Sequence, residues 1–319
     1  MQELSQMEIT RLIQNPRTLS ILNRYQKNKT NVFVSIYPIN KGGGSNTFAY
    51  NIKKWLAKNK EKYNQVYNMC KADKAIIIAD KINIRVLEKA KKRGCFIIHR
   101  LDEHVESNED DYRRKKHAYI KELNALADVT VYQSNFVFEN MHPYLGYPDN
   151  YKVIHNGADP KEFYPNDKAG EFIGHVTWGV GDKKRLDILY EIIVRNPDER
   201  FLLVGNHFRS GYDFAKLSNV KCIGNVKRQD MLSLLHKMKF LFFPSENDPC
   251  PNTAIEAILA GVSVCYNNLG GTKELVMDCG VPVSEFSTML KDYLLFRKRC
   301  LLRNDLGFDT VAQKYMELN

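Results

Sequence analysis

The sequence predicts an α/β protein with two Rossmann-like, doubly wound domains that face a central cleft. Three observations support this prediction. The chain has 319 residues, which is long for a single hydrophobic core. Short apolar runs alternate with helical patterns, as in a parallel sheet covered by helices. This alternation stops once, at residues 157–172, and then starts again.

The first half of the chain supplies one set of strands and helices. Residues 1–30 predict a helical lead-in that is broken by Pro16. Apolar runs predict strands at residues 31–37, 75–79, 95–101, 128–134 and 151–157. Helical patterns lie between these runs, at residues 47–58, 82–93, 108–126 and 135–141. Because parallel strands need such crossovers, these segments predict the first doubly wound domain.

The second half repeats the pattern after an irregular segment. Residues 157–172 contain two prolines and two glycines without periodicity, so they predict the interdomain linker. Strands are expected at residues 172–178, 201–205, 220–224, 240–244 and 262–266, and helices at 183–195, 229–238, around Glu256 and toward the C-terminus. The predicted organisation is an N-terminal extension (1–30), two domains (31–163 and 164–300) and a C-terminal helix that returns to the first domain (301–319).

Composition limits the class of protein. No apolar run approaches the roughly 18–20 residues of a membrane helix, and the N-terminus does not resemble a secretory signal. Seven cysteines without a C-x-x-C pair favour a reducing compartment, which we expect to be the cytoplasm. The net charge of +10 is dispersed and no nucleic-acid module is visible, so we expect no nucleic-acid partner. The densest basic run, residues 112–121, suits an anionic membrane surface, an acidic substrate or a solvated helix face.

A glycine loop follows the first predicted strand. "KGGGSNTFA" (41–49) opens a helix, a context in which Gly43 and Gly44 let backbone amides approach an anionic ligand. It is neither G-x-G-x-x-G nor a Walker motif, and a tight turn also explains it.

Three cations follow the first strand of the second half. Lys183, Lys184 and Arg185 are expected to open the helix at 183–195, where they oppose the helix dipole. A bound diphosphate would compensate for this; solvated surface charge is the alternative.

Two acids lie close together at the end of the predicted strand 240–244. Asp248 and Glu256 are separated by seven residues, and ionised carboxylates are strong acceptors for sugar hydroxyls. The alternative is that Asp248 caps a turn and Glu256 is solvated. In either case Asn252 or Thr253 can cap the helix.

The combination of motifs resembles the GT-B glycosyltransferases of family GT4. "SENDPCPNTAIEAILAGVSVCYNNLGGTKELV" is similar to the donor-site signature of that family, and "VIHNGADPKEFYP" to its interdomain segment. "WGVGDKKRLDIL" is similar to its phosphate-binding turn, "GGGSNTFA" to its glycine loop, and "ADVTVYQSNFV" to its strand that ends in Ser. The resemblance covers about residues 31–280 and implies a GT-B architecture.

The resemblance also implies roles for individual residues. Glu256 would hold the ribose of the nucleotide, Asp248 would contact the donor sugar, and Lys184 would hold the diphosphate. The full donor-side set is Gly43, Gly44, Lys184, Arg185, Glu256, Gly270, Gly271, Thr272 and Glu274. Two departures are visible: the first acid is Asp248 where the family usually has Glu, and an arginine that often precedes the lysine is absent near Gly179.

The acceptor side has fewer signals. "FIIHRLDEH" offers His99, Arg100 and Asp102 at the end of a strand, and Ser134 ends another. His99 and Asp102 are expected to be catalytic together with Asp248, with Arg100 and Ser134 on the acceptor side. A core histidine is the alternative for His99, and an Arg100–Asp102 ion pair can position the acceptor or the loop.

The resemblance implies a retaining hexosyltransferase that moves a sugar from a UDP, GDP or ADP sugar to a glycan, polysaccharide or lipid-linked acceptor. Neither a cofactor nor a metal is expected, because Lys184 and a helix N-terminus can stabilise the leaving diphosphate and no Asp-x-Asp ends a strand. The alternatives are a GT-B epimerase or phosphorylase, a degenerate GT-B protein that binds a sugar nucleotide without transfer, and a basic adaptor. Peripheral contact with an anionic membrane at its cytoplasmic face is a further expectation from charge.

Overall fold

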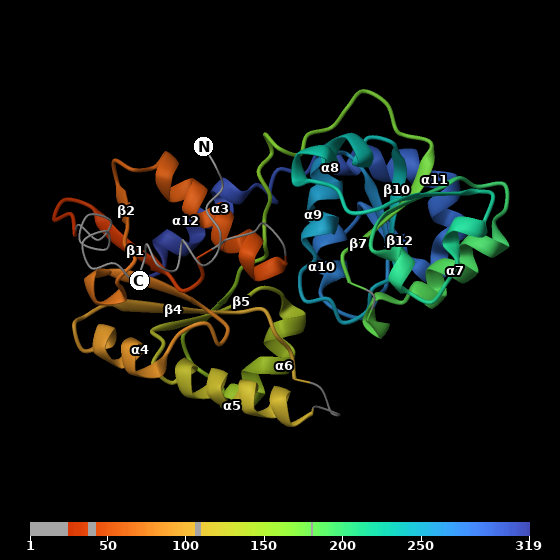
Figure 1. Ribbon diagram of the computed structural model, residues 1–319. Helices are drawn as coiled ribbons and strands as arrows, with labels where there is room; N and C mark the ends of the chain where they lie inside the picture. The colour runs from red at the N-terminus through yellow and green to blue at the C-terminus, as the bar shows by residue number, and fades with distance from the viewer. Residues whose placement is uncertain (1–24, 38–42, 106–109, 180) are drawn as a thin grey trace. The chain divides into compact units, whose positions relative to one another are not determined.

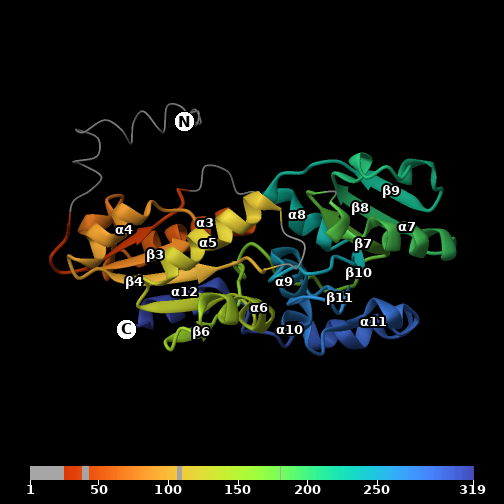
Figure 2. The same cartoon turned by 90° about the horizontal axis from the view of Figure 1, so that it is seen from below.

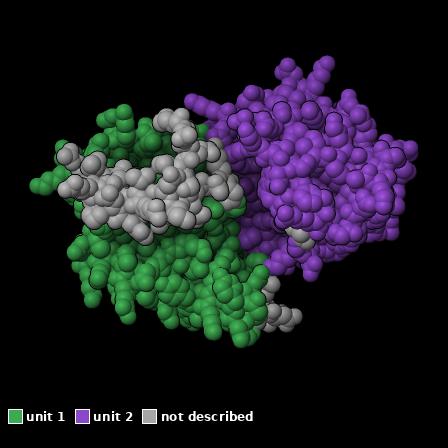
Figure 3. Space-filling view, viewed as in Figure 1, with its two compact units in different colours: residues 1–133, 137–154, 312–319 green, residues 134–136, 155–311 purple. Residues whose placement is uncertain are grey.

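A computed structural model of the chain describes residues 25–37, 43–105, 110–179 and 181–319. It divides the protein into two compact units (Figures 1 and 3). Unit 1 comprises residues 1–133, 137–154 and 312–319, and unit 2 comprises residues 134–136 and 155–311. The expected helical lead-in at residues 1–30 lies mostly outside the described residues. Residues 155–163, expected in the first domain, belong to unit 2.

Unit 1 is built on a parallel six-stranded sheet with the order β2-β1-β3-β4-β5-β6. Its strands are β1 (Thr30–Val34), β2 (Tyr63–Gln65), β3 (Lys74–Ile78), β4 (Phe96–Leu101), β5 (Val129–Tyr132) and β6 (Tyr151–Val153). The chain runs from β1 to β2 on one side and then crosses to β3 on the other, so the order reverses between β1 and β3. Ligands in such sheets bind at the carboxyl ends of the strands beside this reversal.

Helices cover both faces of the sheet in unit 1. They are α3 (Gly44–Lys58), α4 (Ile84–Lys91), α5 (Asp111–Asn124), α6 (Asn135–Leu145) and α12 (Phe308–Glu317), with a short 3₁₀ turn η1 (Met69–Lys71). The first residues of α6 (135 and 136) and of α12 (308–311) belong to unit 2. Leu87 of α4 and Leu123 of α5 pack with Ala75 and Ile77 on one face. The C-terminal residues return to unit 1, where the Tyr315 ring lies 5.1 Å from that of Phe48.

Unit 2 holds a second parallel six-stranded sheet, with the order β12-β11-β10-β7-β8-β9. Its strands are β7 (Phe172–Thr177), β8 (Phe201–Gly205), β9 (Val220–Ile223), β10 (Met238–Phe243), β11 (Ser263–Tyr266) and β12 (Gly280–Pro282). The chain first runs from β7 through β9 and then crosses to β10 on the other side of β7. The order therefore reverses between β7 and β10.

Alternate residues of the strands in unit 2 pack into two separate hydrophobic cores, one on each face of the sheet. Leu202 and Val204 pack with helices α8 (Arg228–Leu235) and α9 (Asn252–Leu259). Phe201 and Leu203 point to the opposite face, toward α7 (Leu186–Arg195) and α11 (Phe286–Cys300). The remaining pieces are α10 (Thr272–Val276) and the 3₁₀ turns η2 (Asp182–Lys184), η3 (His207–Arg209), η4 (Phe214–Lys216) and η5 (Val283–Glu285). The strand order and the covering helices within each unit confirm the predicted doubly wound α/β architecture (Figure 2).

Two findings concern the cysteines and the length of the helices. All seven cysteines lie in described parts of the chain and are free thiols. Among the described helices, none is both long and apolar enough to cross a membrane.

Candidate functional site

The predicted cations and acids of unit 2 meet at the reversal of its strand order. Lys184 follows β7 and Asp248 follows β10, the two strands between which the order reverses. Lys184 Nζ lies 3.4 Å from Asp248 Oδ2, and both side chains are partly exposed. The loops are also joined through their backbones, since the Glu246 N–H donates to the Lys183 carbonyl at 2.8 Å. A cation and an acid are thus held together where a ligand of such a sheet is expected.

The structure corrects the prediction that three cations open a helix at residue 183. Lys183 and Lys184 lie in η2, and α7 begins only at Leu186, with Asp187 in its first turn. Arg185 is the N-cap residue and has a left-handed backbone (φ 48°, ψ 49°). The conflict with the helix dipole therefore does not exist, and the first turn carries the acid that the dipole favours.

Arg185 links the loops that follow β7 and β10. Its guanidinium donates to Asp187 at 2.8 Å and to Glu246 at 3.0 Å. Hydrogen bonds from Arg185 hold the pKa of the Asp187 carboxyl below its usual value, with a backbone N–H adding to the effect. Arg185 is thus engaged with two acids of its own unit, and it fixes the loop on which Lys184 stands.

Glu256 is not a solvated acid. It lies on α9 with 11% of its side chain exposed, and its Oε1 accepts a hydrogen bond from Arg228 Nη1 at 2.7 Å. The same guanidinium donates through Nε to Glu162 at 3.0 Å and lies 4.9 Å from the centre of the Phe163 ring. Burial raises the pKa of Glu256, although Arg228 acts in the opposite direction. The carboxylate is therefore oriented by a buried cation.

The Gly-Gly pair after β11 packs against the loop after β10. Gly270 has φ 112° and forms a bridge with Asp248, and the Gly271 N–H donates to the Asp248 carbonyl at 2.9 Å. A Cβ on Gly271 would stand 2.1 Å from the Pro249 carbonyl oxygen. These glycines are needed because they let two backbones approach, and they thereby position Asp248. Thr272 follows directly and is fully buried.

Glu274, expected to line the donor pocket, is occupied by partners within unit 2. Its carboxylate accepts hydrogen bonds from the backbone N–H groups of Asn135 and Phe136 at 2.7 and 2.8 Å, and lies 3.2 Å from His155 Nε2. Burial raises the pKa of Glu274, but hydrogen bonds from His155 and the two N–H groups outweigh it and lower the pKa. Ser134, the acceptor-side candidate, is buried next to Gly271. The contacts of Glu274 join α10 to residues 135, 136 and 155, and the expected roles of Glu274 and Ser134 in ligand binding stay predictions.

A second polar cluster lies in unit 1, at the end of β4. Asp102 accepts hydrogen bonds from Ser45 Oγ and from Arg100 Nη1, the latter at 2.9 Å. Arg100 is fully buried, donates also to Gln133 at 2.8 Å, and lies 4.3 Å from the centre of the Phe48 ring. The structure thus shows the Arg100–Asp102 ion pair that the sequence suggested, and it connects this pair to the first turn of α3.

The glycines before α3 differ in the reason for their presence. Gly43 is the N-cap residue with φ 80°, a conformation that favours glycine. At Gly44 a Cβ would meet no described atom within 4 Å. The helix N-terminus that these residues begin is one that can face an anion.

His99 serves the core of unit 1. It is 1% exposed, its Nδ1 accepts a hydrogen bond from Asn124 at 3.0 Å, and its Nε2 lies 2.9 Å from the Ala79 carbonyl. Burial lowers its pKa to about 4, so it is neutral at pH 7. Both ring nitrogens are engaged, which is the arrangement that the alternative of a core histidine describes, and a catalytic role of His99 stays a prediction.

Sequence reasoning missed the partners of the predicted residues. Arg228 pairs with both Glu256 and Glu162, and Ser45 donates a hydrogen bond to Asp102. Arg228 did carry a signal, because it is a cation directly at the start of a predicted helix, as Lys184 was thought to be. Glu162 had none, since it lies in the irregular segment that was interpreted as a linker.

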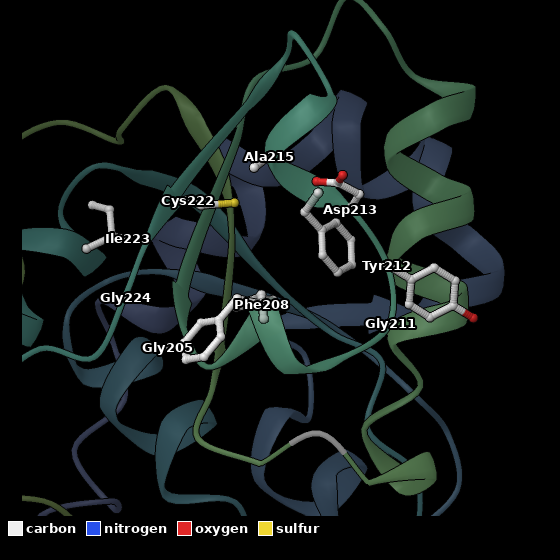
Figure 4. A pocket seen from close by; sticks show the side chains of 11 residues that line it. Gly205, Phe208, Gly211, Tyr212, Asp213, Ala215, Cys222, Ile223 and Gly224 are labelled. Carbon is white, nitrogen blue, oxygen red and sulfur yellow. The ribbon is translucent and has the colours of Figure 1, made fainter.

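Unit 2 also contains a pocket of about 350 Å³ at the carboxyl ends of β8 and β9 (Figure 4). Residues 206–219 connect these strands through η3 and η4, where a parallel crossover usually has an α-helix. Phe208, Tyr212 and Phe214 contribute aromatic rings to its lining, and Asp213 contributes a carboxylate. This lining suits no diphosphate.

Among the residues that the structure describes, no group of three or more His, Cys, Asp or Glu side chains is placed to hold a metal ion.

Comparisons with known proteins identify the fold. Residues 172–291 match the family model described as Glycosyl transferases group 1. No curated protein sequence matches the chain. Sucrose-phosphate synthase from Thermosynechococcus elongatus has a similar structure, with a TM-score of 0.70, 14% identity, and an alignment that covers 91% of this chain and 98% of that one.

Two other solved structures give the same result. HepE from Anabaena in complex with UDP has a TM-score of 0.69 at 15% identity, over 90% of this chain and 98% of that one. The lipopolysaccharide outer core galactosyltransferase WaaB has a TM-score of 0.61 at 14% identity, over 90% of this chain and 99% of that one. Together with the two parallel sheets, these likenesses show that the chain has the GT-B fold.

Proposed function

We propose that this protein transfers a sugar from a nucleotide-diphosphate sugar to an acceptor hydroxyl. The observation that carries the proposal is the meeting of Lys184 and Asp248 at the reversal of strand order in unit 2. The match of residues 172–291 to Glycosyl transferases group 1 supports it. So do the solved complexes of HepE with UDP and with UDP-glucose, which share the fold.

The residues of unit 2 suit the charges of such a donor. Lys184 would pair with the diphosphate, and Asp248, which it now contacts, would accept hydrogen bonds from the hydroxyls of the sugar. Glu256 would accept from the ribose, since Arg228 holds one of its oxygens and keeps the carboxylate oriented. Charge on the leaving diphosphate grows in the transition state, so a preformed cation beside it accelerates transfer.

The finer features follow from the resemblance to family GT4. They are a retaining mechanism, hexosyl transfer without a metal ion, and a UDP, GDP or ADP donor. The acceptor would be a glycan, a polysaccharide or a lipid-linked sugar, reached at the cytoplasmic face of a membrane. Arg100 and Asp102 would contact this acceptor.

Donor binding is tested by thermal unfolding with UDP, GDP, ADP and their sugar conjugates, with and without magnesium. A ligand at about 100 times its dissociation constant stabilises by roughly 2.7 kcal/mol. In a unit of about 160 residues this raises the unfolding temperature by roughly 5–10 °C. We expect one nucleotide family to give this shift with and without magnesium. A flat panel would overturn the proposal.

Matched variants locate the binding site. Glu256→Gln removes the charged acceptor, which weakens binding roughly 10- to 100-fold. The thermal shift at the same nucleotide concentration, measured against the free variant, should then fall to about half or less. Glu199→Gln is the control, because Glu199 pairs with Lys239 elsewhere in unit 2. Equal losses in both variants would contradict the assignment of Glu256.

A sugar-nucleotide-binding protein without transfer activity is the second candidate. Two observations favour it. The acid at position 248 is Asp, which is shorter than the usual Glu. Arg185 is paired with two acids, so it does not replace the arginine that is missing near Gly179. Slow hydrolysis of the donor sugar in buffer separates the two functions. A transferase releases nucleotide diphosphate, and Lys184→Ala suppresses the release, whereas a binding protein shows the thermal shift alone.

A further inference from the structure

The outer face of α11 carries a stripe of exposed leucines and lysines. We name it the α11 stripe: Lys291, Leu294, Leu295, Lys298, Leu301 and Leu302. From Leu294 on, the members follow one another at three- and four-residue steps, so Leu294, Leu295 and Lys298 share one side of the helix, and Leu301 and Leu302 lie in the turn that follows it. Lys291 precedes a kink at Asp292 (φ −113°, ψ 15°). All six are exposed, with fractions of 53%, 49%, 47% and 82% for the leucines in chain order.

The opposite face of the same helix already fills the core. Phe286, Met289 and Phe296 are buried against the sheet of unit 2. Figure 2 shows α11 running along the outer side of this unit. The stripe leucines therefore contribute little to folding. Single exposed leucines are ordinary on a protein surface, but four within residues 294–302 form an apolar patch, which marks an interaction surface.

The charged members of the stripe are both cations. Lys291 and Lys298 are seven residues apart, on the two sides of the kink, and each is followed three and four residues later by a pair of leucines. Lysines in this arrangement extend their alkyl stems along apolar surface and place the ammonium groups among lipid phosphates. A second copy of the chain would instead bring its own two lysines to the contact, and the net charge of +10 adds repulsion.

From this pattern we infer that the α11 stripe docks unit 2 on an anionic lipid membrane. The leucines enter the boundary between headgroups and acyl chains, and the lysines pair with anionic headgroups. The inference goes beyond sugar transfer and does not depend on it. It also assigns the membrane contact to unit 2, and not to the basic run at residues 112–121 of unit 1.

Flotation of the full chain with lipid vesicles tests the inference. Vesicles of phosphatidylcholine alone are compared with vesicles of phosphatidylcholine and phosphatidylglycerol in a 7:3 ratio, in which roughly a third of the lipid headgroups are anionic. We expect binding to the anionic vesicles only. Leu294→Ser with Leu295→Ser should reduce the partition coefficient at least about tenfold, and Lys291→Glu with Lys298→Glu should reduce it at least about 25-fold.

Three controls make the result specific. Leu269→Ser alters a leucine of unit 2 that is 57% exposed but lies outside α11, and it should bind vesicles like the unchanged protein. Leu302→Trp should show a blue shift of its fluorescence when anionic vesicles are added. Arg113→Glu with Lys115→Glu alters the basic run of unit 1, and should leave at least half of the binding.

Several results would overturn the inference. One is the absence of binding to anionic vesicles. Another is binding that survives the leucine pair but disappears with the Arg113 and Lys115 changes. A third is a dimer in light scattering that only the leucine substitutions dissolve, without vesicle binding. Because the substituted side chains are exposed, the variants should keep the unfolding temperature and the nucleotide response of the unchanged chain.

Discussion

Replacing Arg228 with Met tests whether Glu256 depends on a buried cation. The guanidinium lies between Glu256 and Glu162, at 2.7 and 3.0 Å, and only 17% of the side chain is exposed. Methionine keeps most of the apolar stem beside Phe163 but removes the charge. Two carboxylates would then remain with no cation between them, and Glu256 could reach solvent only through the 11% of its side chain that is exposed.

The expected loss can be sized from this geometry. Removing one partner of a buried ion pair costs about 3–5 kcal/mol, because the other charge stays buried without compensation. In a unit of about 160 residues this lowers the unfolding temperature by roughly 6–20 °C. Removing both charges, in Arg228→Met with Glu256→Gln, should restore at least about 2 kcal/mol of this loss.

The stability lost in Arg228→Met should also be larger at high pH than at low pH. Burial raises the pKa of Glu256, and Arg228 counteracts this, so the Met variant has a still higher pKa at this position. An acid with a raised pKa in the folded state contributes stability at low pH and loses it as the pH rises through that pKa. The damage in Arg228→Met should therefore be largest at pH 8 and smaller at pH 5.

Urea unfolding followed by circular dichroism, at pH 5 and pH 8, measures all three variants. Arg228→Lys is the conservative control and should keep a large part of the stability, since it retains the charge. The reasoning fails if the double variant is as unstable as Arg228→Met alone, or if the loss is the same at both pH values.

Three further predictions use single positions. Gly271→Ala should cost about 1–3 kcal/mol, because its Cβ would stand 2.1 Å from a backbone oxygen, whereas Gly181→Ala, which meets no described atom and has φ −66°, should be neutral or slightly stabilising in urea unfolding. Lys184→Ala should weaken binding of a nucleotide diphosphate roughly 10- to 100-fold in calorimetry, while Lys216→Ala, which breaks only a surface pair, should not. Burial lowers the pKa of His207 to about 4, so stability should fall by up to about 3 kcal/mol as the pH drops from 6.5 to 4, and urea unfolding should show a shallower slope in His207→Leu.

The sheets could be predicted because their central strands are continuously apolar. "AIIIA" and "FLFF" lie in strands buried on both faces, so local sequence and tertiary environment agree there. The edge strands β2 and β12 were missed for the opposite reason. "YNQ" has no apolar pattern and "GVP" combines glycine with proline, and both segments become strands only because a neighbour offers its backbone.

The places of the candidate site residues in the fold could be predicted, but their contacts could not. Lys184 and Asp248 follow apolar strands, and Glu256 lies on the helix after the second of these strands, so the sequence places them near the carboxyl edge of the sheet. The αL backbone of Arg185 could not be foreseen, since an arginine has no preference for it. Its conformation separates η2 from α7, and this moved the helix start by three residues from the predicted one.

Each of the predicted donor residues Lys184, Glu256 and Glu274 already has a partner within the protein, and the strength of that contact limits how a ligand can bind. Lys184 contacts Asp248, Glu256 contacts Arg228, and Glu274 contacts His155 and two backbone N–H groups. Only the first of these pairs is loosely held, at 3.4 Å between partly exposed side chains, so it can exchange partners at small cost. The Glu256–Arg228 pair is short and buried, and breaking it would leave an uncompensated charge. In the proposed donor complex, a diphosphate would therefore replace Asp248 beside Lys184, whereas a ribose would bind Glu256 with Arg228 still in place.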